Sequence, residues 1–217
     1  MVGVTIPNQT TPYVGQQFSF SLPTNSFSDP DGDTLVYSAS LDNGGTLPSW
    51  LTFNSVTEIF SGTPTVGSQG NYTIKVTAID QKGGTVSQSF ILTVPNRGIT
   101  AKTIATQKVS VGSSFYYNLP ITTFIDGDGD PLSYSASLQN GTALPSWLSF
   151  SSGAFSGTPI SGMQGSYNTT IVVQDNHGES ASSNFVLSVI NAVPISTPIQ
   201  DQTAKLGSVF SFVVPSL

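Results

Sequence analysis

Short stretches of alternating apolar and polar residues run through the chain, and they predict β-strands. Phe18, Phe20 and Leu22 alternate with polar residues, and the same period of two recurs along residues 72–78 and 90–94. A period of two gives a strand one buried face. Gly and Pro punctuate these stretches at intervals of roughly 8 to 12 residues, the spacing of an all-β sandwich. No stretch keeps a helical period, so we expect helix to be nearly absent.

The pattern occurs twice in full. The phrase FSDPDGDTLVYSASL that starts at Phe27 returns as FIDGDGDPLSYSASL at Phe124, and LPSWL and then FSGTP follow each copy. Such recurrence indicates a repeat array. We therefore divide the chain into repeat one (1–95), repeat two (96–190) and the start of an incomplete third repeat (191–217, its strands A and B).

Each full repeat has the length of one Ig-like sandwich. In repeat one we expect seven strands, near 3–14, 17–23, 34–41, 50–53, 58–61, 71–79 and 85–94. The predicted fold class is all-β, with tandem Ig-like or cadherin-like seven-stranded β-sandwiches in a linear array. The linkers at 94–97 and 189–192 are short and lack Gly/Ser tracts, so the repeats should line up end to end.

Aromatic residues mark equivalent positions of the two repeats. Trp50 and Trp147 each follow a Pro-Ser turn and stand beside apolar residues, which favours a core anchor over a sugar-stacking surface residue. Tyr72 and Tyr167 lie at the start of the sixth strand, where Ig-like sandwiches have a tyrosine corner.

The alternating residues Phe210, Phe212 and Val214 lack the strands that would cover them. We expect the C-terminal segment either to pack on repeat two or to be completed by a neighbouring copy, as in a fibre.

Composition is consistent with an extracellular or cell-surface setting. Six Lys+Arg and 12 Asp+Glu give a net charge of -6, and with no basic cluster this argues against nucleic acid and anionic membranes as partners. No apolar run is long enough for a membrane helix, so we expect no membrane insertion in this segment. Residues 1–3 do not open a signal peptide, and a leader or anchor would lie outside the segment.

The absence of cysteine excludes disulfides and thiolate metal sites. Asn-x-Ser/Thr sequons permit glycosylation in a eukaryotic source, at Asn8, Asn71, Asn140 and Asn168.

Eight of the 12 carboxylates form two matching sets: Asp29, Asp31, Asp33 and Asp80, and Asp126, Asp128, Asp130 and Asp175. If every strand reverses direction, the Asp-rich loop and the end of the sixth strand meet at the pole beside the preceding linker. Four carboxylates there would repel one another without a cation, and Ca²⁺ takes six to eight oxygen ligands. Turn formation alone is the alternative for the loop. An EF-hand is excluded because no Glu stands at the twelfth position and no helices flank the loop.

The run D-x-D-G-D-x-L-x-Y-S-A-S-L, with LPSWL-x-F, FSGTP and G-x-Y-x-I-x-V-x-A-x-D-x-x-G, resembles the cadherin-like repeats of dystroglycan type, also described as putative Ig repeats. These occur in surface proteins, bacterial adhesins and polysaccharide-degrading enzymes. The resemblance implies calcium between successive repeats, held by Asp126, Asp128 and Asp175 with linker Asn96. It implies that Asn191 serves the next junction, and that Asp29, Asp31 and Asp80 face a preceding domain.

The chain departs from the cadherin pattern in several ways. The Asp-x-Asn-Asp-Asn linker and the Leu-Asp-Arg-Glu segment are missing, and Arg97 adds a positive charge near the site. We therefore expect one weakly bound ion per junction rather than three.

Catalysis has little support in the sequence. The single histidine, His177, lies in an Asn-His-Gly turn and is interpreted as a solvated loop residue, and no catalytic triad is evident. We expect a non-catalytic adhesion, stalk or fibre segment. Its partners would be adjacent repeats, neighbouring copies, or cell-surface proteins or glycans. The alternatives are a carbohydrate-binding module that uses exposed Tyr13, Tyr116 or Tyr134, and a passive spacer without a ligand.

Overall fold

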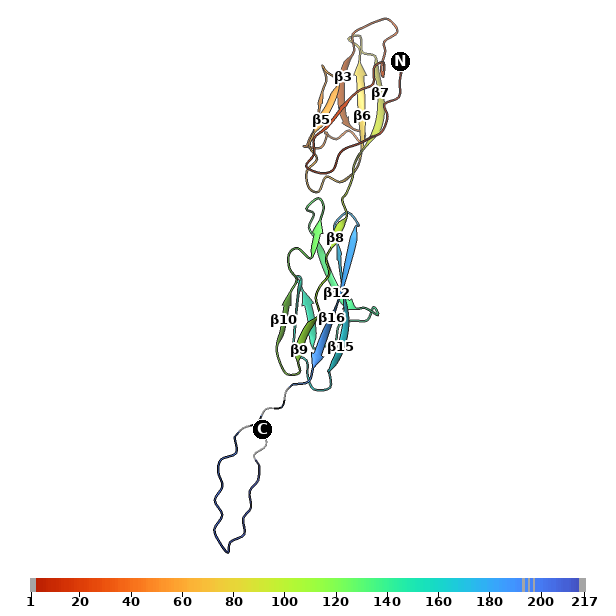
Figure 1. Ribbon diagram of the computed structural model, residues 1–217. Coiled ribbons are helices and arrows are strands. Elements are labelled where there is room, and N and C mark those ends of the chain that lie inside the picture. Colours follow the sequence, from red (N-terminus) through yellow and green to blue (C-terminus); the bar gives the residue numbers. More distant parts are fainter. Residues whose placement is uncertain (1–2, 193, 195, 197, 215–217) are drawn as a thin grey trace.

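The computed structural model describes residues 3–192, 194, 196 and 198–214, and within them every regular element is a β-strand. The all-β prediction is therefore confirmed. No described segment is a helix of the length and apolarity needed to cross a membrane. Repeat one and repeat two lie end to end, joined by the short linker at 95–98 (Figure 1).

Repeat one is a sandwich of two sheets. One sheet has the order β1-β7-β6-β3 and the other β2-β5-β4. The strands are β1 (Gln9–Thr10), β2 (Phe18–Ser21), β3 (Val36–Leu41), β4 (Leu51–Asn54), β5 (Ile59–Gly62), β6 (Gly70–Ile79) and β7 (Thr85–Val94). Six of the seven expected strands form close to their predicted bounds.

The first expected strand, near 3–14, is interrupted. Gly3 and Val4 donate backbone hydrogen bonds to Ser26 and Asn25. Further along, β1 pairs in parallel with β7. A segment that changes its backbone partner in this way cannot keep one continuous ladder, so its regular part is two residues long.

Repeat two has the same plan. Its larger sheet has the order β9-β16-β15-β12, and β10-β14-β13 faces it, with a two-stranded sheet of β8 and β11 beside the linker. The strands are β8 (Ile99–Ala101), β9 (Gln107–Ser110), β10 (Phe115–Asn118), β11 (Phe124–Asp126), β12 (Ser133–Leu138), β13 (Leu148–Ser151), β14 (Ala154–Gly157), β15 (Gly165–Gln174) and β16 (Ser180–Ile190).

Each repeat has its own hydrophobic core, built from the inward residues of the alternating strands. Phe60 and its equivalent Phe155 are fully buried at the two centres. Trp50 packs against the first core and Trp147 against the second, each edge-on to a tyrosine at 5.9 and 5.7 Å. The interpretation of the tryptophans as core residues is therefore confirmed, although each keeps part of its surface exposed.

The predicted tyrosine corners are present in both repeats. Tyr72 Oη donates to the carbonyl of Ser68 at 2.8 Å, and Tyr167 Oη donates to the carbonyl of Met163 at 2.9 Å. Each hydrogen bond joins a loop to the long strand that follows it, β6 in repeat one and β15 in repeat two. These two are the sixth strands of the predicted seven-strand pattern. This loop lies at the end of the repeat that faces the next linker.

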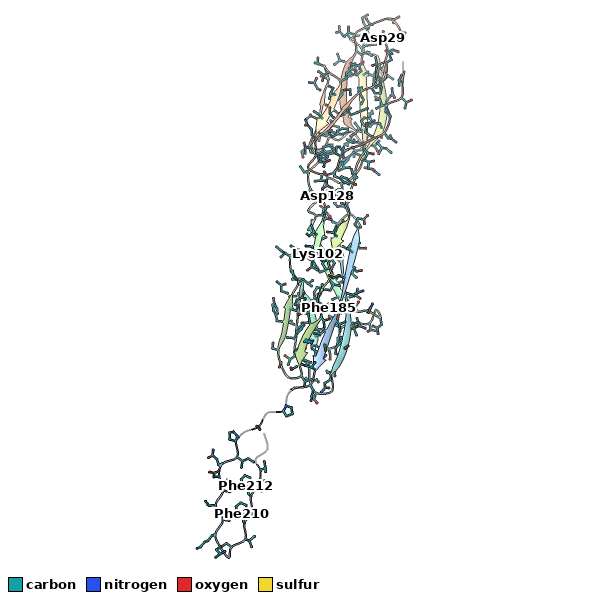
Figure 2. The ribbon with its side chains drawn as sticks, in the orientation of Figure 1. Asp29, Lys102, Asp128, Phe185, Phe210 and Phe212 are labelled. Carbon is teal, nitrogen blue, oxygen red and sulfur yellow. The ribbon has the colours of Figure 1, made fainter. Side chains whose placement is uncertain are left out.

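The C-terminal segment differs from expectation. Its described residues form no strand and are exposed, including Phe210 and Phe212. Figures 1 and 2 show it extending away from repeat two. Packing on repeat two is therefore not observed, because the partner strands that cover Phe18 and Phe115 in the full repeats have no counterpart among the described residues here. Residues 193, 195, 197 and 215–217 lie outside the described part.

Candidate metal site at the junction

The Asp-rich loop folds in the same way in both repeats. In repeat two, Asp126 Oδ1 accepts hydrogen bonds from the backbone N–H groups of Asp128 and Asp130, both at 2.9 Å. In repeat one, Asp29 Oδ1 accepts those of Asp31 and Asp33, at 2.9 and 3.1 Å. The loop needs a left-handed residue in its middle, and Gly129 supplies it with a φ of 84°.

The aspartate after the sixth strand closes a second turn. Asp175 Oδ1 accepts the N–H groups of His177 and Glu179 at 2.8 and 2.9 Å. Asp80 Oδ1 does the same for Lys82 and Gly84 at 2.7 and 2.8 Å. One oxygen of the aspartate is thus used within its own turn, and the other is left for outside partners.

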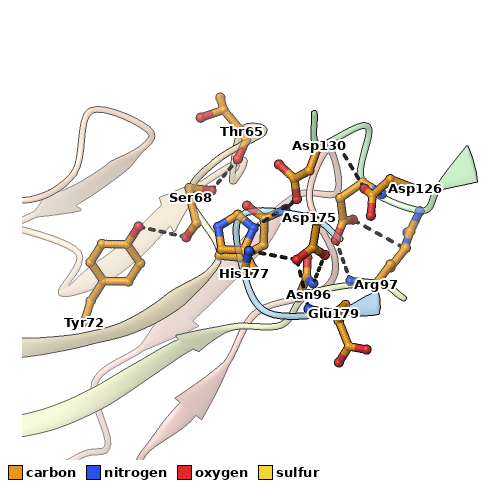
Figure 3. A network of polar contacts seen from close by, with 12 residues as sticks. Thr65, Ser68, Tyr72, Asn96, Arg97, Asp126, Asp130, Asp175, His177 and Glu179 are labelled. Atoms are coloured by element: carbon orange, nitrogen blue, oxygen red, sulfur yellow. Dashed lines mark hydrogen bonds and ion pairs between the residues drawn. The ribbon is translucent and has the colours of Figure 1, made fainter. Parts of the chain in front are cut away.

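At the junction, the aspartates of repeat two accept hydrogen bonds from repeat one and from the linker (Figure 3). Asn96 Nδ2 donates to Asp175 Oδ2 at 2.9 Å, and the backbone N–H of Arg97 donates to Asp128 Oδ2 at 2.6 Å. From the loop before β6, Gln69 Nε2 donates to Asp130 Oδ2 at 2.6 Å. Repeat one, the linker and repeat two therefore meet at one cluster.

Docking of repeat one buries the carboxylates of repeat two. Asp126, Asp128, Asp130 and Asp175 are between 5% and 8% exposed. Their equivalents Asp29, Asp31, Asp33 and Asp80 lie at the far end of repeat one, and none of the four is buried. The same sequence motif thus has a buried and a solvated environment in one chain.

Several buried oxygen atoms in the cluster have no hydrogen-bond donor. Eight buried side-chain polar atoms of the described residues lack a partner, and five of them are oxygens of this junction: Gln69 Oε1, Asn96 Oδ1, Asp126 Oδ2, Asp128 Oδ1 and Asp130 Oδ1. A buried acceptor without a partner costs free energy, and more when it is charged. Oxygens of this kind are the atoms that a cation could take as ligands.

Arg97 and His177 contact carboxylates of the cluster. Arg97 Nε lies 3.7 Å from Asp128 Oδ1, too far for a hydrogen bond, and its guanidinium stacks over Tyr13 at 4.5 Å. His177 Nδ1 lies 3.1 Å from Asp130 Oδ2. The interpretation of His177 as a solvated loop residue is therefore wrong. The turn after the sixth strand folds back over the Asp-rich loop, as Lys82 does beside Asp33 in repeat one at 3.4 Å.

The linker also explains a sequence difference between the two loops. A Cβ added to Gly127 would lie 2.5 Å from Arg97 Cβ, so any larger residue would collide with the linker. Repeat one has Pro30 at the equivalent position, which is exposed.

Burial and hydrogen bonding shift the pKa values of two of the carboxylates in opposite directions. Burial raises the pKa of Asp130, and the neighbouring Asp126 and Asp128 add to this effect while His177 opposes it. Burial also tends to raise the pKa of Asp175, but hydrogen bonds from Asn96 and from the backbone of His177 and Glu179 outweigh it, and the pKa is lowered. Asp130 and Asp175 therefore respond differently to burial in the same cluster.

The donor set fits a divalent cation. Ligand atoms of Asp130, Asp175 and His177 lie within 4.8 Å of one another. Gln69 is bonded to Asp130 and Asn96 to Asp175, and both amides have an oxygen without a donor. Carboxylate and amide oxygens are the ligands of a hard cation. Zinc would instead prefer four nitrogen or sulfur ligands, and of these the cluster offers only His177 among the described residues.

The predicted metal ligands fall into three groups. Asp126, Asp128, Asp130, Asp175 and Asn96 come together at the junction. Asp29, Asp31, Asp33 and Asp80 come together at the exposed end of repeat one. Asn191 is exposed and its Oδ1 accepts from Gln164 Nε2 at 3.4 Å.

Sequence reasoning missed Gln69 and His177. A Gln-Gly pair recurs at the start of the sixth strand, as Gln69-Gly70 in repeat one and Gln164-Gly165 in repeat two. This recurrence is the signal that could have identified Gln69.

The comparisons with known proteins agree with this architecture. The profile of a family described as Putative Ig domain matches residues 1–95 and again 98–190. The chain belongs to the Putative Ig domain family. No curated protein is similar enough in sequence to count as a match.

Solved structures similar to these two Ig domains include three of low identity. The endo-fucoidan hydrolase MfFcnA9 from glycoside hydrolase family 107 is 25% identical with a TM-score of 0.36, over 85% of this chain and 33% of its own. The I-band fragment I67–I69 from titin is 20% identical with a TM-score of 0.38, over 86% and 64%. Immunoglobulin domains 1–4 of Sidekick-1 are 15% identical with a TM-score of 0.43, over 87% and 48%. The chain spans about a third or less of the fucoidan hydrolases.

Two hollows, three exposed tyrosines and the sequon residues are the other surface features of the Ig domains. Equivalent hollows of about 440 and 330 Å³ adjoin Tyr167 and Tyr72, but neither brings several titratable groups together. Tyr13 is engaged by Arg97, whereas Tyr116 is 70% and Tyr134 40% exposed. The sequon residues Asn8, Asn71, Asn140 and Asn168 are all exposed.

Proposed function

We propose that this chain is a non-catalytic, rod-forming segment of an extracellular surface protein, such as an adhesin, stalk or fibre, and that calcium stiffens its junctions. The observation that carries the proposal is the set of five buried, unpartnered oxygens between two sandwiches placed end to end. The cadherin-like character of the repeats is part of the same proposal. Partners would be adjacent repeats, neighbouring copies, or cell-surface proteins or glycans.

Calcium suits the cluster better than other common cations. It takes six to eight oxygen ligands in flexible geometry, whereas magnesium demands a near-ideal octahedron and gives up its water reluctantly. Asp126 Oδ2, Asp128 Oδ1, Asp130 Oδ1 and Asn96 Oδ1 are available as oxygen ligands. Arg97 offsets only part of the charge of four buried aspartates, so a bound dication removes repulsion that the protein alone leaves.

Calcium would act as a mechanical brace. Asn96 lies in the linker, and Asp126, Asp128 and Asp130 lie on a loop of repeat two that also contacts repeat one through Gln69. An ion bound to these groups joins linker and loop at one point, so bending of the junction would break its coordination. A short linker without a Gly/Ser tract leaves little other freedom.

Titration calorimetry with calcium tests the metal site. We expect one ion per chain at the junction, with a dissociation constant of roughly 0.1 to 1 mM, the range of extracellular calcium modules. Asp130→Asn should weaken binding by about tenfold or more, because it removes a charged ligand. Asp33→Asn, the matched change at the exposed end, should leave this binding unchanged. Wild-type protein that takes up no calcium, or equal losses in both variants, would contradict the proposal.

Small-angle X-ray scattering tests the brace. Two sandwiches of roughly 40 Å each, estimated from about 3.3 Å per strand residue, form a long particle only if the junction stays straight. We expect a larger maximum dimension in calcium than in chelator, with a narrower distribution of interdomain distances. The Asp128→Asn, Asp175→Asn double variant should give the chelator profile under both conditions. A compact particle with the repeats side by side would contradict the proposed end-to-end arrangement.

A further inference from the structure

Gln69 stands out among the residues of the junction, because it is the side chain of repeat one that is hydrogen-bonded to the acidic loop of repeat two. It is 9% exposed, and its Nε2 donates to Asp130 Oδ2 at 2.6 Å. Its Oε1 is buried and has no donor. An amide that is nine-tenths buried with its oxygen unpartnered is poorly satisfied as a purely structural residue.

We propose that Gln69 is a calcium ligand supplied by the preceding repeat, so that the ion is bound fully only when the two repeats are docked. This inference rests on the proposed calcium site, and it assigns the side chain of repeat one that would contact the ion. Without such a ligand, the linker and repeat two would supply every protein ligand, and the ion would not hold repeat one directly.

The amide can serve both states of the junction. Without a cation, its N–H group faces the Asp130 carboxylate and offsets negative charge. A cation bound to that carboxylate reverses the requirement, because it attracts the amide oxygen and repels the N–H group. Half a turn about the terminal side-chain bond exchanges the two atoms in nearly the same volume. Gln69 is thus suited to alternate between donor and ligand without movement of the backbone.

The other end of repeat two carries the same pair of amides. Gln164 and Asn191 are equivalent to Gln69 and Asn96, and they are bonded to each other at 3.4 Å. In the described part of the chain this pair faces no aspartate cluster, and Gln164 is exposed. Gln164 therefore provides a matched control, with the same residue type in the same loop of the same fold.

The test is calcium titration of the full chain carrying Gln69→Ala, Gln69→Glu, Gln164→Ala or Gln164→Glu. We expect Gln69→Ala to weaken calcium binding by about tenfold, the usual cost of losing a supporting group at a metal site. Gln69→Glu should bind calcium at least as tightly as wild type, because carboxylate ligands raise affinity, yet should melt at a lower temperature in chelator, where it repels Asp130. Both Gln164 variants should match wild type.

The outcomes separate this inference from the proposed function. If wild type binds calcium and Gln69→Ala binds equally well, Gln69 is no ligand and the inference fails while the calcium site stands. If Gln69→Glu weakens binding as much as Gln69→Ala, the residue acts only as a donor to Asp130, and the inference fails again. If wild type binds no calcium, the proposed function itself is wrong.

Discussion

Replacing Phe60 with alanine is expected to unfold repeat one at a much lower temperature while repeat two keeps its own transition. Phe60 is fully buried, and its ring lies 4.5 to 6.4 Å from those of Phe20, Phe53 and Phe90. Truncation of a buried phenylalanine costs about 3–5 kcal/mol. Because the two cores share no residues, this loss should stay within one repeat.

Each repeat has a single tryptophan packed on its core, Trp50 or Trp147, so fluorescence can follow the repeats one at a time. In a Trp147→Phe background, Phe60→Ala should lower the melting temperature reported by Trp50. Phe155→Ala should leave that signal in place and should lower the Trp147 transition in a Trp50→Phe background. Val56→Ala, at an 89% exposed position, is the neutral control. If the melting temperatures reported by both tryptophans shifted together in either variant, the repeats would fold as one unit.

Calcium should raise the melting temperature of repeat two by a large margin. A ligand that binds only the folded state at one hundred times its dissociation constant stabilises by about 2.7 kcal/mol. For a domain of this size that corresponds to roughly 10–20 °C, at about 4–8 °C per kcal/mol. Scanning calorimetry in calcium and in chelator measures the shift.

The double variant Asp128→Asn, Asp175→Asn should lose this gain. Asparagine keeps the shape and can still accept from Arg97 and from the turn after the sixth strand, so both repeats should stay folded. In chelator the variant should be somewhat less stable than wild type, because it loses the charged partners of Asn96 Nδ2 and of the Arg97 guanidinium. Asp31→Asn with Asp80→Asn, the matched change at the exposed end, should retain the calcium shift. Identical curves for wild type in calcium and chelator would remove the calcium site.

The strands could be predicted because their signal is local. Alternation fixes which face of a strand is buried, and Gly or Pro fixes where it stops. The interrupted first strand could not be read in this way, because its path depends on which sheet offers a partner at each point. The exposed C-terminal segment shows the same limit, since the alternating Phe210 and Phe212 form no strand and the described residues around them offer no partner strand.

The acidic set of each repeat was also predictable, because strand reversal brings the Asp-rich loop and the end of the sixth strand to one pole. The roles of Gln69 and His177 were not. Gln69 is 61 residues from Asp130 in the chain and belongs to the other repeat, and His177 reaches Asp130 only because its turn folds over the loop.

By itself, the sequence determined the all-β class, the strand positions and the turns closed by Asp29, Asp80, Asp126 and Asp175, because each depends on residues close together in the chain. Only the tertiary structure decided which acidic set is buried. The motifs at Asp29 and Asp126 fold alike and bond to the same backbone positions. Docking of repeat one on the second set removes water from its carboxylates and leaves oxygens without donors, and burial of this kind depends on contacts between distant segments rather than on local sequence.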